Sequence, residues 1–341
     1  MTGAGAPGGI GISKCLKEDK NINLFVSDAN PTANGRYLNK NRFLLTEKAT
    51  SERFVPQILE ICKENDIKII FPLVTLELFK FAEHKELFEK EGIKVIVSDK
   101  NNLDIANNKS RLYEHLSKQG ILTPQYKVVS KGDFDGFIEA IEDLGYPEKA
   151  VCMKPSVSNG SRGVRIIDDL ADKFDLLFNQ KPNNLYISSD EILAILRGKD
   201  FPELLLSEVL PFEEYTIDTI VNEGKPILIL PRIRKKMNNG ISVEGQFIEN
   251  QEIIQYCQQI IESMNLHGPI GIQVKKAEDG RFKILEINPR IQGTSMAAMG
   301  LGINLPLIAV QQELGLPVVI PPINWGLSFS RYYSEVFYNS Q

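Results

Sequence analysis

The sequence has 341 residues, of which 43% are hydrophobic and 24% charged, as in ordinary globular proteins. This length predicts two or three domains. The net charge of −5 gives no electrostatic reason to expect nucleic acid or an anionic membrane as a partner. No apolar run approaches the roughly 18 residues that cross a bilayer. The first residues lack the basic and apolar segments of a secretory signal.

The four cysteines are far apart and form no metal-binding pattern, and the three histidines make a zinc site a poor hypothesis. We therefore expect a reduced, cytoplasmic setting. A homodimer through the first domain is a base-rate expectation only.

The first hundred residues alternate between strand and helix patterns, which predicts a small parallel sheet covered by helices. The expected strands are 23–27, 67–71 and 94–97, and the expected helices are 10–17, 51–64 and 75–90. Gly3, Gly5 and Gly8 match the spacing of a dinucleotide fingerprint, with Asp28 in the ribose position. Only two residues precede Gly3, so the first strand is truncated. A structural or substrate-contacting role for these glycines is favoured over nicotinamide binding.

Asn107 and Asn108 predict the cap of a helix over 110–119, which Gly120 ends. Lys109 would then lie at the positive end of the helix dipole, an unfavourable place unless an anion is near. The alternative is an exposed lysine beside a cap.

Residues 150–167 predict a strand that ends at Lys154, a loop of small residues over 156–163, and a returning strand over 164–167. Backbone N–H groups of such a loop can approach phosphate oxygens, and the lysine adds a positive charge. The alternative is a flexible surface hairpin. No Walker motif is present, which excludes an ordinary P-loop nucleoside triphosphatase.

The segment 204–236 predicts strands over 204–210, 214–221 and 226–230, followed by a basic loop. This loop contains Arg232, Arg234, Lys235 and Lys236. It is either solvated or holds a substrate carboxylate or phosphate. Helices are expected over 250–264 and 305–314.

Residues 271–290 predict a hairpin that turns at Asp279 and Gly280. A two-residue loop there places Gln273 opposite Glu286, and Asn288 on the same face as Glu286. Carboxylate and amide oxygens are ligands that suit Mg²⁺. Arg290 follows the strand and can reach an anion beside the metal. The alternative is a polar strand end on a solvated hairpin.

Taken in order, these blocks resemble an ATP-grasp enzyme of the carbamoyl-phosphate-synthase-like branch. The sequence Glu-Ile-Asn-Pro-Arg at 286–290, following Lys109, Lys154 and Glu208, carries the resemblance. The implied fold class is α/β and α+β, with a Rossmann-like pre-ATP-grasp domain at 1–97 followed by a two-lobed ATP-grasp fold. A linker helix and lid lobe would occupy 98–126 and 127–205, and a C-terminal catalytic lobe 206–341.

The resemblance also implies roles for individual residues. Lys109 and Lys154 would contact ATP phosphates, under a lid loop that includes Ser158, Gly160 and Gly163. Glu208 and Leu210 would line the hinge at adenine, and Glu214 would hold the ribose. Gln273, Glu286 and Asn288 would hold one or two Mg²⁺ ions, with Mn²⁺ as a substitute, and Arg290 would steady the transferred phosphoryl group.

The expected function is a cytoplasmic ligase that activates a small carboxylate as an acyl phosphate for attack by an amine or thiol, releasing ADP and phosphate. Two alternatives stay open. One is a carboxylase that uses bicarbonate, and the other is a nucleotide-binding protein without turnover.

Overall fold

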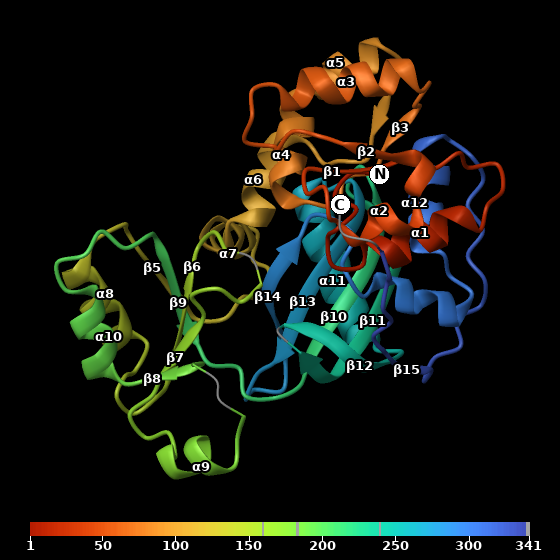
Figure 1. The fold of residues 1–341 in the computed structure, drawn as a ribbon. Coiled ribbons are helices and arrows are strands. Elements are labelled where there is room, and N and C mark those ends of the chain that lie inside the picture. The colour runs from red at the N-terminus through yellow and green to blue at the C-terminus, as the bar shows by residue number, and fades with distance from the viewer. Residues whose placement is uncertain (159, 182–183, 239, 339–341) are drawn as a thin grey trace. The chain divides into compact units, whose positions relative to one another are not determined.

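The computed structural model describes residues 1–158, 160–181, 184–238 and 240–338. The chain forms two compact units (Figure 1). Unit 1 contains Met1–Asp104, Tyr215–Gln273 and Ile287–Gln341, and unit 2 contains Ile105–Glu214 and Val274–Glu286. No helix in the described ranges is long and apolar enough to span a membrane.

Short parallel strands form the sheet at the N-terminal end of unit 1. Strand β1 (Val26–Asp28) pairs with β2 (Phe43–Leu45), and β3 (Ile69–Ile70) pairs with β4 (Lys94–Val95). Thr2 bridges the two pairs, because it forms a parallel bridge with Ser27 and its N–H donates to the carbonyl of Phe71 at 3.1 Å. At the position of the expected first strand, Thr2 thus forms a single bridge between the two strand pairs.

The helices around this sheet differ from prediction in two ways: one expected helix is broken, and α2 (Asn34–Leu38), η1 (Lys40–Arg42) and α6 (Lys100–Asn107) were not predicted. The expected single helix over 75–90 is wrong, because the backbone of His84 leaves the helical region with φ of −116°. A ring nitrogen of His84 lies 2.9 Å from the carbonyl oxygen of Lys80 and satisfies the interrupted helix end. The other helices here are α1 (Gly9–Lys17), α3 (Phe54–Glu64), α4 (Thr75–Glu83) and α5 (Lys85–Lys90).

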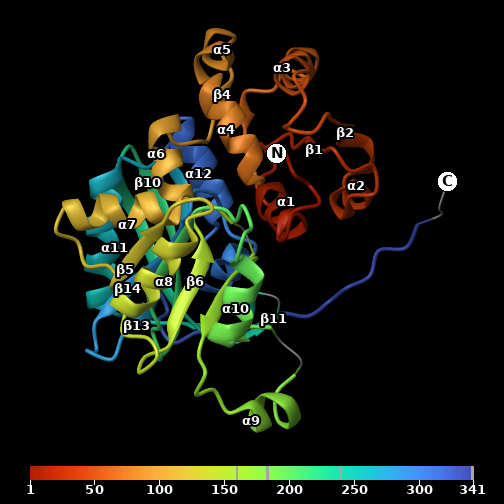
Figure 2. The ribbon, with the colours of Figure 1, turned by 90° about the vertical axis from the view of Figure 1, so that its left-hand side faces the viewer.

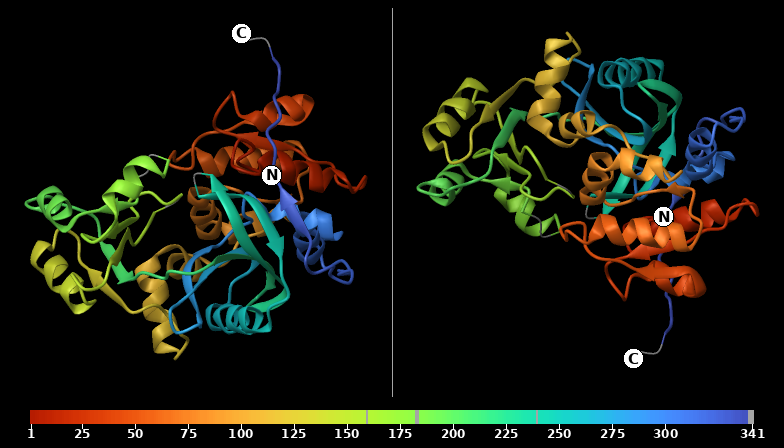
Figure 3. Two further views of the ribbon diagram at one scale, coloured as in Figure 1. Left: turned by 90° about the horizontal axis from the view of Figure 1, so that it is seen from below. Right: turned by 90° about the horizontal axis from the view of Figure 1, so that it is seen from above.

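The larger part of unit 1 is built on a six-stranded sheet with the order β14-β13-β10-β11-β12-β15. Its strands are β10 (Glu214–Asn222), β11 (Lys225–Asn238), β12 (Ile241–Phe247), β13 (Gly268–Lys276), β14 (Phe282–Asn288) and β15 (Ser328–Ser330). The far end of the β13–β14 hairpin, 274–286, belongs to unit 2. Helix α11 (Gln251–Met264) packs against β11, as both views of Figure 3 show.

The predicted basic loop over 232–236 is wrong. Strand β11 runs on through these residues and pairs with β12, with Arg232 opposite Phe247. The strand continues here because Arg232 is buried and its Nε and Nη2 atoms find partners inside the unit. After β14 the chain forms η2 (Ser295–Leu301) and α12 (Leu305–Glu313), which pack with α1.

Unit 2 contains a five-stranded sheet in the order β5-β9-β6-β7-β8, with α8 and α10 on one face (Figures 1 and 2). Phe137 of α8 and Ile192 of α10 belong to its core, together with Leu204 and Leu206 of β9. The strands are β5 (Tyr126–Val129), β6 (Val151–Pro155), β7 (Arg165–Ile167), β8 (Tyr186–Ile187) and β9 (Leu204–Glu208). The helices are α7 (Lys109–Lys118), α8 (Phe134–Asp143), α9 (Lys173–Phe178) and α10 (Ser189–Leu196).

Candidate active site

Lys109 begins helix α7, and its side chain points into unit 2. The side chain of Asn108 caps the helix by accepting from the N–H of Arg111 at 3.1 Å, as predicted. The Nζ of Lys109 lies 3.5 Å from Oε2 of Glu286 and donates to the carbonyl of Ser158 at 3.1 Å. Lys109 is only 5% exposed, so the alternative of a surface lysine is wrong.

Lys154 reaches the same region from β6 and is also 5% exposed. Its ammonium donates to the hydroxyl of Tyr113 at 3.3 Å and to the carbonyl of Leu285 at 3.4 Å. Strand pairing fixes its direction, because Lys154 lies opposite Leu205 in the middle of the β6–β9 ladder.

The electrostatics of this cluster favour an anion. Burial lowers the pKa of Lys109, the charge of Glu286 opposes this, and the charge of Lys154 lowers the pKa further. Lys109 is paired with the carboxylate of Glu286, whereas Lys154 bonds to a hydroxyl and a carbonyl, so these three side chains carry a net positive charge. Phosphate oxygens are the ligand that such an excess stabilises.

The loop between β6 and β7 begins beside α7. The N–H of Lys109 donates to the carbonyl of Ser156 at 2.8 Å, and the hydroxyls of Ser110 and Ser156 lie 2.6 Å apart. Gly160 and Gly163 have φ of +65° and +77°, a backbone region that favours glycine. A side chain on Gly163 would also collide with Pro155. These contacts explain the small residues of the loop; Asn159 lies outside the described residues.

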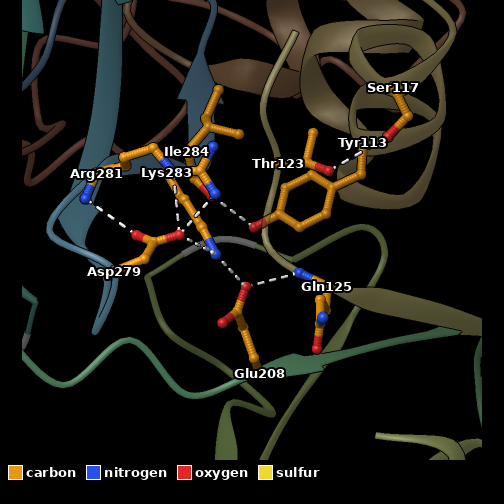
Figure 4. Close-up of polar contacts among 9 residues, drawn as sticks. All are labelled: Tyr113, Ser117, Thr123, Gln125, Glu208, Asp279, Arg281, Lys283 and Ile284. Carbon is orange, nitrogen blue, oxygen red and sulfur yellow. Dashed lines mark hydrogen bonds and ion pairs between the residues drawn. The ribbon is translucent and has the colours of Figure 1, made fainter. Parts of the chain in front are cut away.

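Glu208 ends β9 and has two partners in unit 2 (Figure 4). Its Oε1 accepts from the N–H of Gln125 and from the ammonium of Lys283, each at 2.7 Å. Lys283 also lies 3.6 Å from Asp279. Near Glu208 in sequence, Leu210 is buried and Glu214, the first residue of β10, is half-buried.

The hairpin turn differs from the prediction. The N–H of Ala277 donates to the carbonyl of Arg281 at 2.9 Å, and Gly280 donates to the carbonyl of Ala277 at 3.0 Å. The loop thus contains three residues, with Gly280 at φ of +79°, rather than two. The predicted pairing of Glu278 with Arg281 is wrong. The pairing of Gln273 with Glu286 was counted along both strands from a two-residue loop, and that count no longer applies. The pairing itself is untested and stays a prediction.

The predicted residues of unit 1 follow a burial alternation. Ile272 and Ile287 are buried, whereas Gln273 and Asn288 are half-buried. Asn288 is therefore on the less buried face of β14, two residues from Glu286. Arg290 donates from Nε to the hydroxyl of Thr75 at 3.3 Å and from Nη1 to the carbonyl of Ile291 at 3.0 Å.

A second polar cluster in unit 1 surrounds Arg232. Its guanidinium donates from Nε to Asp218 at 2.8 Å and from Nη2 to the hydroxyl of Thr294. The other carboxylate oxygen of Asp218 accepts from Ser295 at 2.5 Å and from Gln292 at 3.3 Å. Nη1 of Arg232 is buried and has no partner among the described residues. The cluster fixes residues 292–295, directly after Arg290.

The glycine-rich turn packs against these same residues. A Cβ atom on Gly8 would lie 2.7 Å from the Cα of Gly293, so the two backbones touch. The N–H of Gly5 donates to the carboxylate of Asp28 at 2.7 Å. A dinucleotide ribose would need this same carboxylate. These contacts give the glycines the structural role that the sequence favoured.

Three residues in this region were missed by the sequence reasoning: Tyr113, Lys283 and Thr75. Tyr113 carried a signal, since it lies four residues after Lys109 and so on the same helix face. Lys283 and Thr75 gave none, because their partners are 75 and 215 residues away in the sequence.

The side chains predicted to bind metal carry oxygen ligands, which suit a hard cation better than a softer metal. Gln273, Glu286 and Asn288 offer only oxygen and one carboxylate charge, which suits Mg²⁺ that shares its coordination with a substrate. Within the described ranges, no group of three His, Cys, Asp or Glu side chains could hold a metal ion.

Comparison with known proteins agrees with this architecture. Residues 4–96 match the N-terminal domain of PylC-like proteins. Residues 200–330 match the family described as ATP-grasp in the biosynthetic pathway with Ter operon. Residues 200–330 thus carry an ATP-grasp match and residues 4–96 a PylC-like match, and the expected two-lobed ATP-grasp fold is confirmed.

The curated relatives are consistent with the carbamoyl-phosphate-synthase-like branch. The large chain of carbamoyl phosphate synthase from Pseudothermotoga lettingae is 24% identical over 312 residues. The match covers 87% of this chain but 26% of that protein, so this chain spans about a quarter of its length.

Solved structures share the fold. Carboxyaminoimidazole ribonucleotide synthase from Aspergillus clavatus, complexed with ATP, has a TM-score of 0.67 at 15% identity, covering 92% of this chain and 76% of that one. An L-amino acid ligase from Bacillus licheniformis has a TM-score of 0.62 at 14% identity, covering 89% and 72%.

Proposed function

We propose that this protein is an ATP- and Mg²⁺-dependent ligase that activates a small carboxylate as an acyl phosphate and joins it to an amine or thiol. The observation that carries the proposal is the pair of buried lysines, Lys109 beside the carboxylate of Glu286 and Lys154 with only neutral hydrogen-bond partners among the described residues. The ATP-grasp match and the nucleotide complex of a structural relative support it.

In this proposal, Lys109 and Lys154 bind nucleotide phosphates, and the loop with Ser158, Gly160 and Gly163 covers them. Glu208 and Leu210 contact adenine and Glu214 the ribose. Gln273, Glu286 and Asn288 hold Mg²⁺, for which Mn²⁺ can substitute. The bound metal would neutralise phosphate charge.

The reaction proceeds in two transfers. A carboxylate oxygen attacks the γ-phosphorus of ATP, and the bond to the β-phosphate oxygen breaks to give ADP. The amine nitrogen or thiol sulfur then attacks the acyl carbon, phosphate leaves, and the acceptor loses a proton to solvent. Arg290, Lys109 and Lys154 stabilise charge on the transferred group. The covering loop excludes water, which would hydrolyse the acyl phosphate.

The test is ADP release from ATP in the presence of a panel of carboxylate and amine pairs, with and without bicarbonate. We expect turnover that requires one pair and Mg²⁺ and that Lys154→Met abolishes. Lys127→Met, which removes an exposed lysine of the same unit, is the matched control. AMP and pyrophosphate as products would exclude the mechanism. Turnover that depends on bicarbonate would favour the carboxylase alternative.

A further inference from the structure

Tyr113 lies at the centre of the cluster that contains the two lysines. It follows Lys109 by one helical turn on α7, and its side chain is fully buried. Its ring packs edge-to-face on Tyr126 of β5, with ring centroids 5.4 Å apart. The ring position is therefore fixed from two elements of unit 2.

The hydroxyl of Tyr113 has three polar neighbours: the carbonyl of Ile284, which is the nearest, the carbonyl of Leu285 at 3.4 Å, and the ammonium of Lys154. It donates its proton to the carbonyl of Ile284 at 2.7 Å (Figure 4). Because the proton points to this carbonyl, a lone pair is left for the ammonium of Lys154, which lies 3.3 Å away. Lys154 also lies 5.3 Å from the centre of the tyrosine ring.

We infer that Tyr113 is a positioning residue, whose hydroxyl holds the ammonium of Lys154 in place to receive nucleotide phosphates. The inference rests on the proposed function. A neutral hydroxyl suits this task, since a carboxylate in its place would cancel the charge that Lys154 offers to a phosphate. Burial raises the pKa of Tyr113 well above its ordinary value, which keeps the hydroxyl neutral.

In this geometry, the ammonium of Lys154 can still donate a hydrogen bond to a ligand. An ammonium has three N–H groups, and Tyr113 and the carbonyl of Leu285 accept two of them. The third can donate to a phosphate oxygen. Without the tyrosine hydroxyl, the flexible lysine side chain must be ordered when the nucleotide binds, which weakens binding.

The experiment measures binding of ADP and of a non-hydrolysable ATP analogue, each with Mg²⁺, by calorimetry. Tyr113→Phe and its matched control Tyr126→Phe are compared in wild type and in Lys154→Met. We expect Tyr113→Phe to weaken binding of the ATP analogue about 3- to 10-fold, the effect of one hydrogen bond. Tyr126→Phe is expected to leave it unchanged. In the Lys154→Met background, Tyr113→Phe is expected to add no further loss.

If Tyr113→Phe weakens nucleotide binding equally in both backgrounds, its role is generally structural and the inference is overturned. The inference is also overturned if Tyr113→Phe does not weaken binding in the wild-type background. If Lys154→Met binds both nucleotides as wild type does, the proposed function falls as well. A crystal structure of the wild-type nucleotide complex gives a check without variants. Lys154 within hydrogen-bond distance of both Tyr113 and a phosphate oxygen supports the inference, and Lys154 turned away from Tyr113 overturns it.

Discussion

The Nε of Arg290 donates a hydrogen bond to the hydroxyl of Thr75 at 3.3 Å, across 215 residues of sequence. Thr75 is the first residue of α4 and Arg290 follows β14. The PylC-like domain therefore supplies a partner to the arginine proposed to act in phosphoryl transfer.

Replacing this hydroxyl should affect turnover more than nucleotide binding. We expect Thr75→Val to lower kcat about 2- to 10-fold, as one hydrogen bond is lost, with little change in the KM for ATP. Thr75→Ser keeps the hydroxyl and should approach wild type. A rise in KM at constant kcat would mean that Arg290 acts in binding. Both constants come from ADP release.

Glu286→Gln should keep the fold and reduce Mg²⁺-dependent binding of ADP by at least about tenfold, because the only charged ligand of the proposed set is removed. Calorimetry over a range of Mg²⁺ concentrations measures this. Glu278→Gln, at an exposed carboxylate in the loop of the same hairpin, is the control. Unchanged Mg²⁺ dependence in Glu286→Gln would place the metal elsewhere.

Lys283→Met should destabilise the protein more than loss of an exposed ion pair does. Among the described residues, it leaves Glu208, whose side chain is 27% exposed, with the N–H of Gln125 as hydrogen-bond donor. We expect a loss of about 1–3 kcal/mol in the free energy of unfolding. Lys127→Met breaks the exposed pair with Asp143, which is 2.5 Å long, and should cost about 0–1 kcal/mol. Urea unfolding compares the two variants, and equal costs would contradict the expectation.

Glu77 should make stability depend on pH. Burial raises its pKa to about 7 from 4.5, although the hydrogen bond from Thr2 opposes this. The folded state thus holds a proton that the unfolded state releases near pH 4.5. The stabilisation is complete below that pH and is lost as pH rises toward 7. Unfolding free energies at several pH values should fall less steeply over this window in Glu77→Gln than in wild type. The exposed Glu64→Gln should follow wild type.

Gly8→Ala should be costly, because the new Cβ would meet the backbone of Gly293 and the residue has φ of +87°. Left-handed backbone and collision together should cost about 2–5 kcal/mol. Gly92→Ala, at φ of +72° with open space around the added atom, should cost about 1–2 kcal/mol from the backbone alone. If urea unfolding gives similar losses of stability for Gly8→Ala and Gly92→Ala, the backbone around Gly293 can shift at little cost.

Local patterns in the sequence predicted much of this molecule. The cap at Asn108, the strand that ends at Lys154 and the helix that follows Asn250 all depend on residues close in sequence. The domain boundaries and the individual roles of the site residues remain predictions.

The helix break at His84 and the three-residue loop of the β13–β14 hairpin are local differences, whereas other errors arose where distant partners decide the structure. Strand β11 continues through Arg232 because Asp218 and Thr294, from other elements, accept its hydrogen bonds. Likewise, no residue near Lys283 in the sequence indicates that its ammonium contacts Glu208.

The touching backbones of Gly8 and Gly293 constrain any attempt to recombine this protein with its relatives. Since neither position has room for a side chain, a chimera that receives a foreign segment 4–96 would have to receive the matching 291–296 segment as well. The two stretches form one exchangeable part, although almost the whole chain separates them.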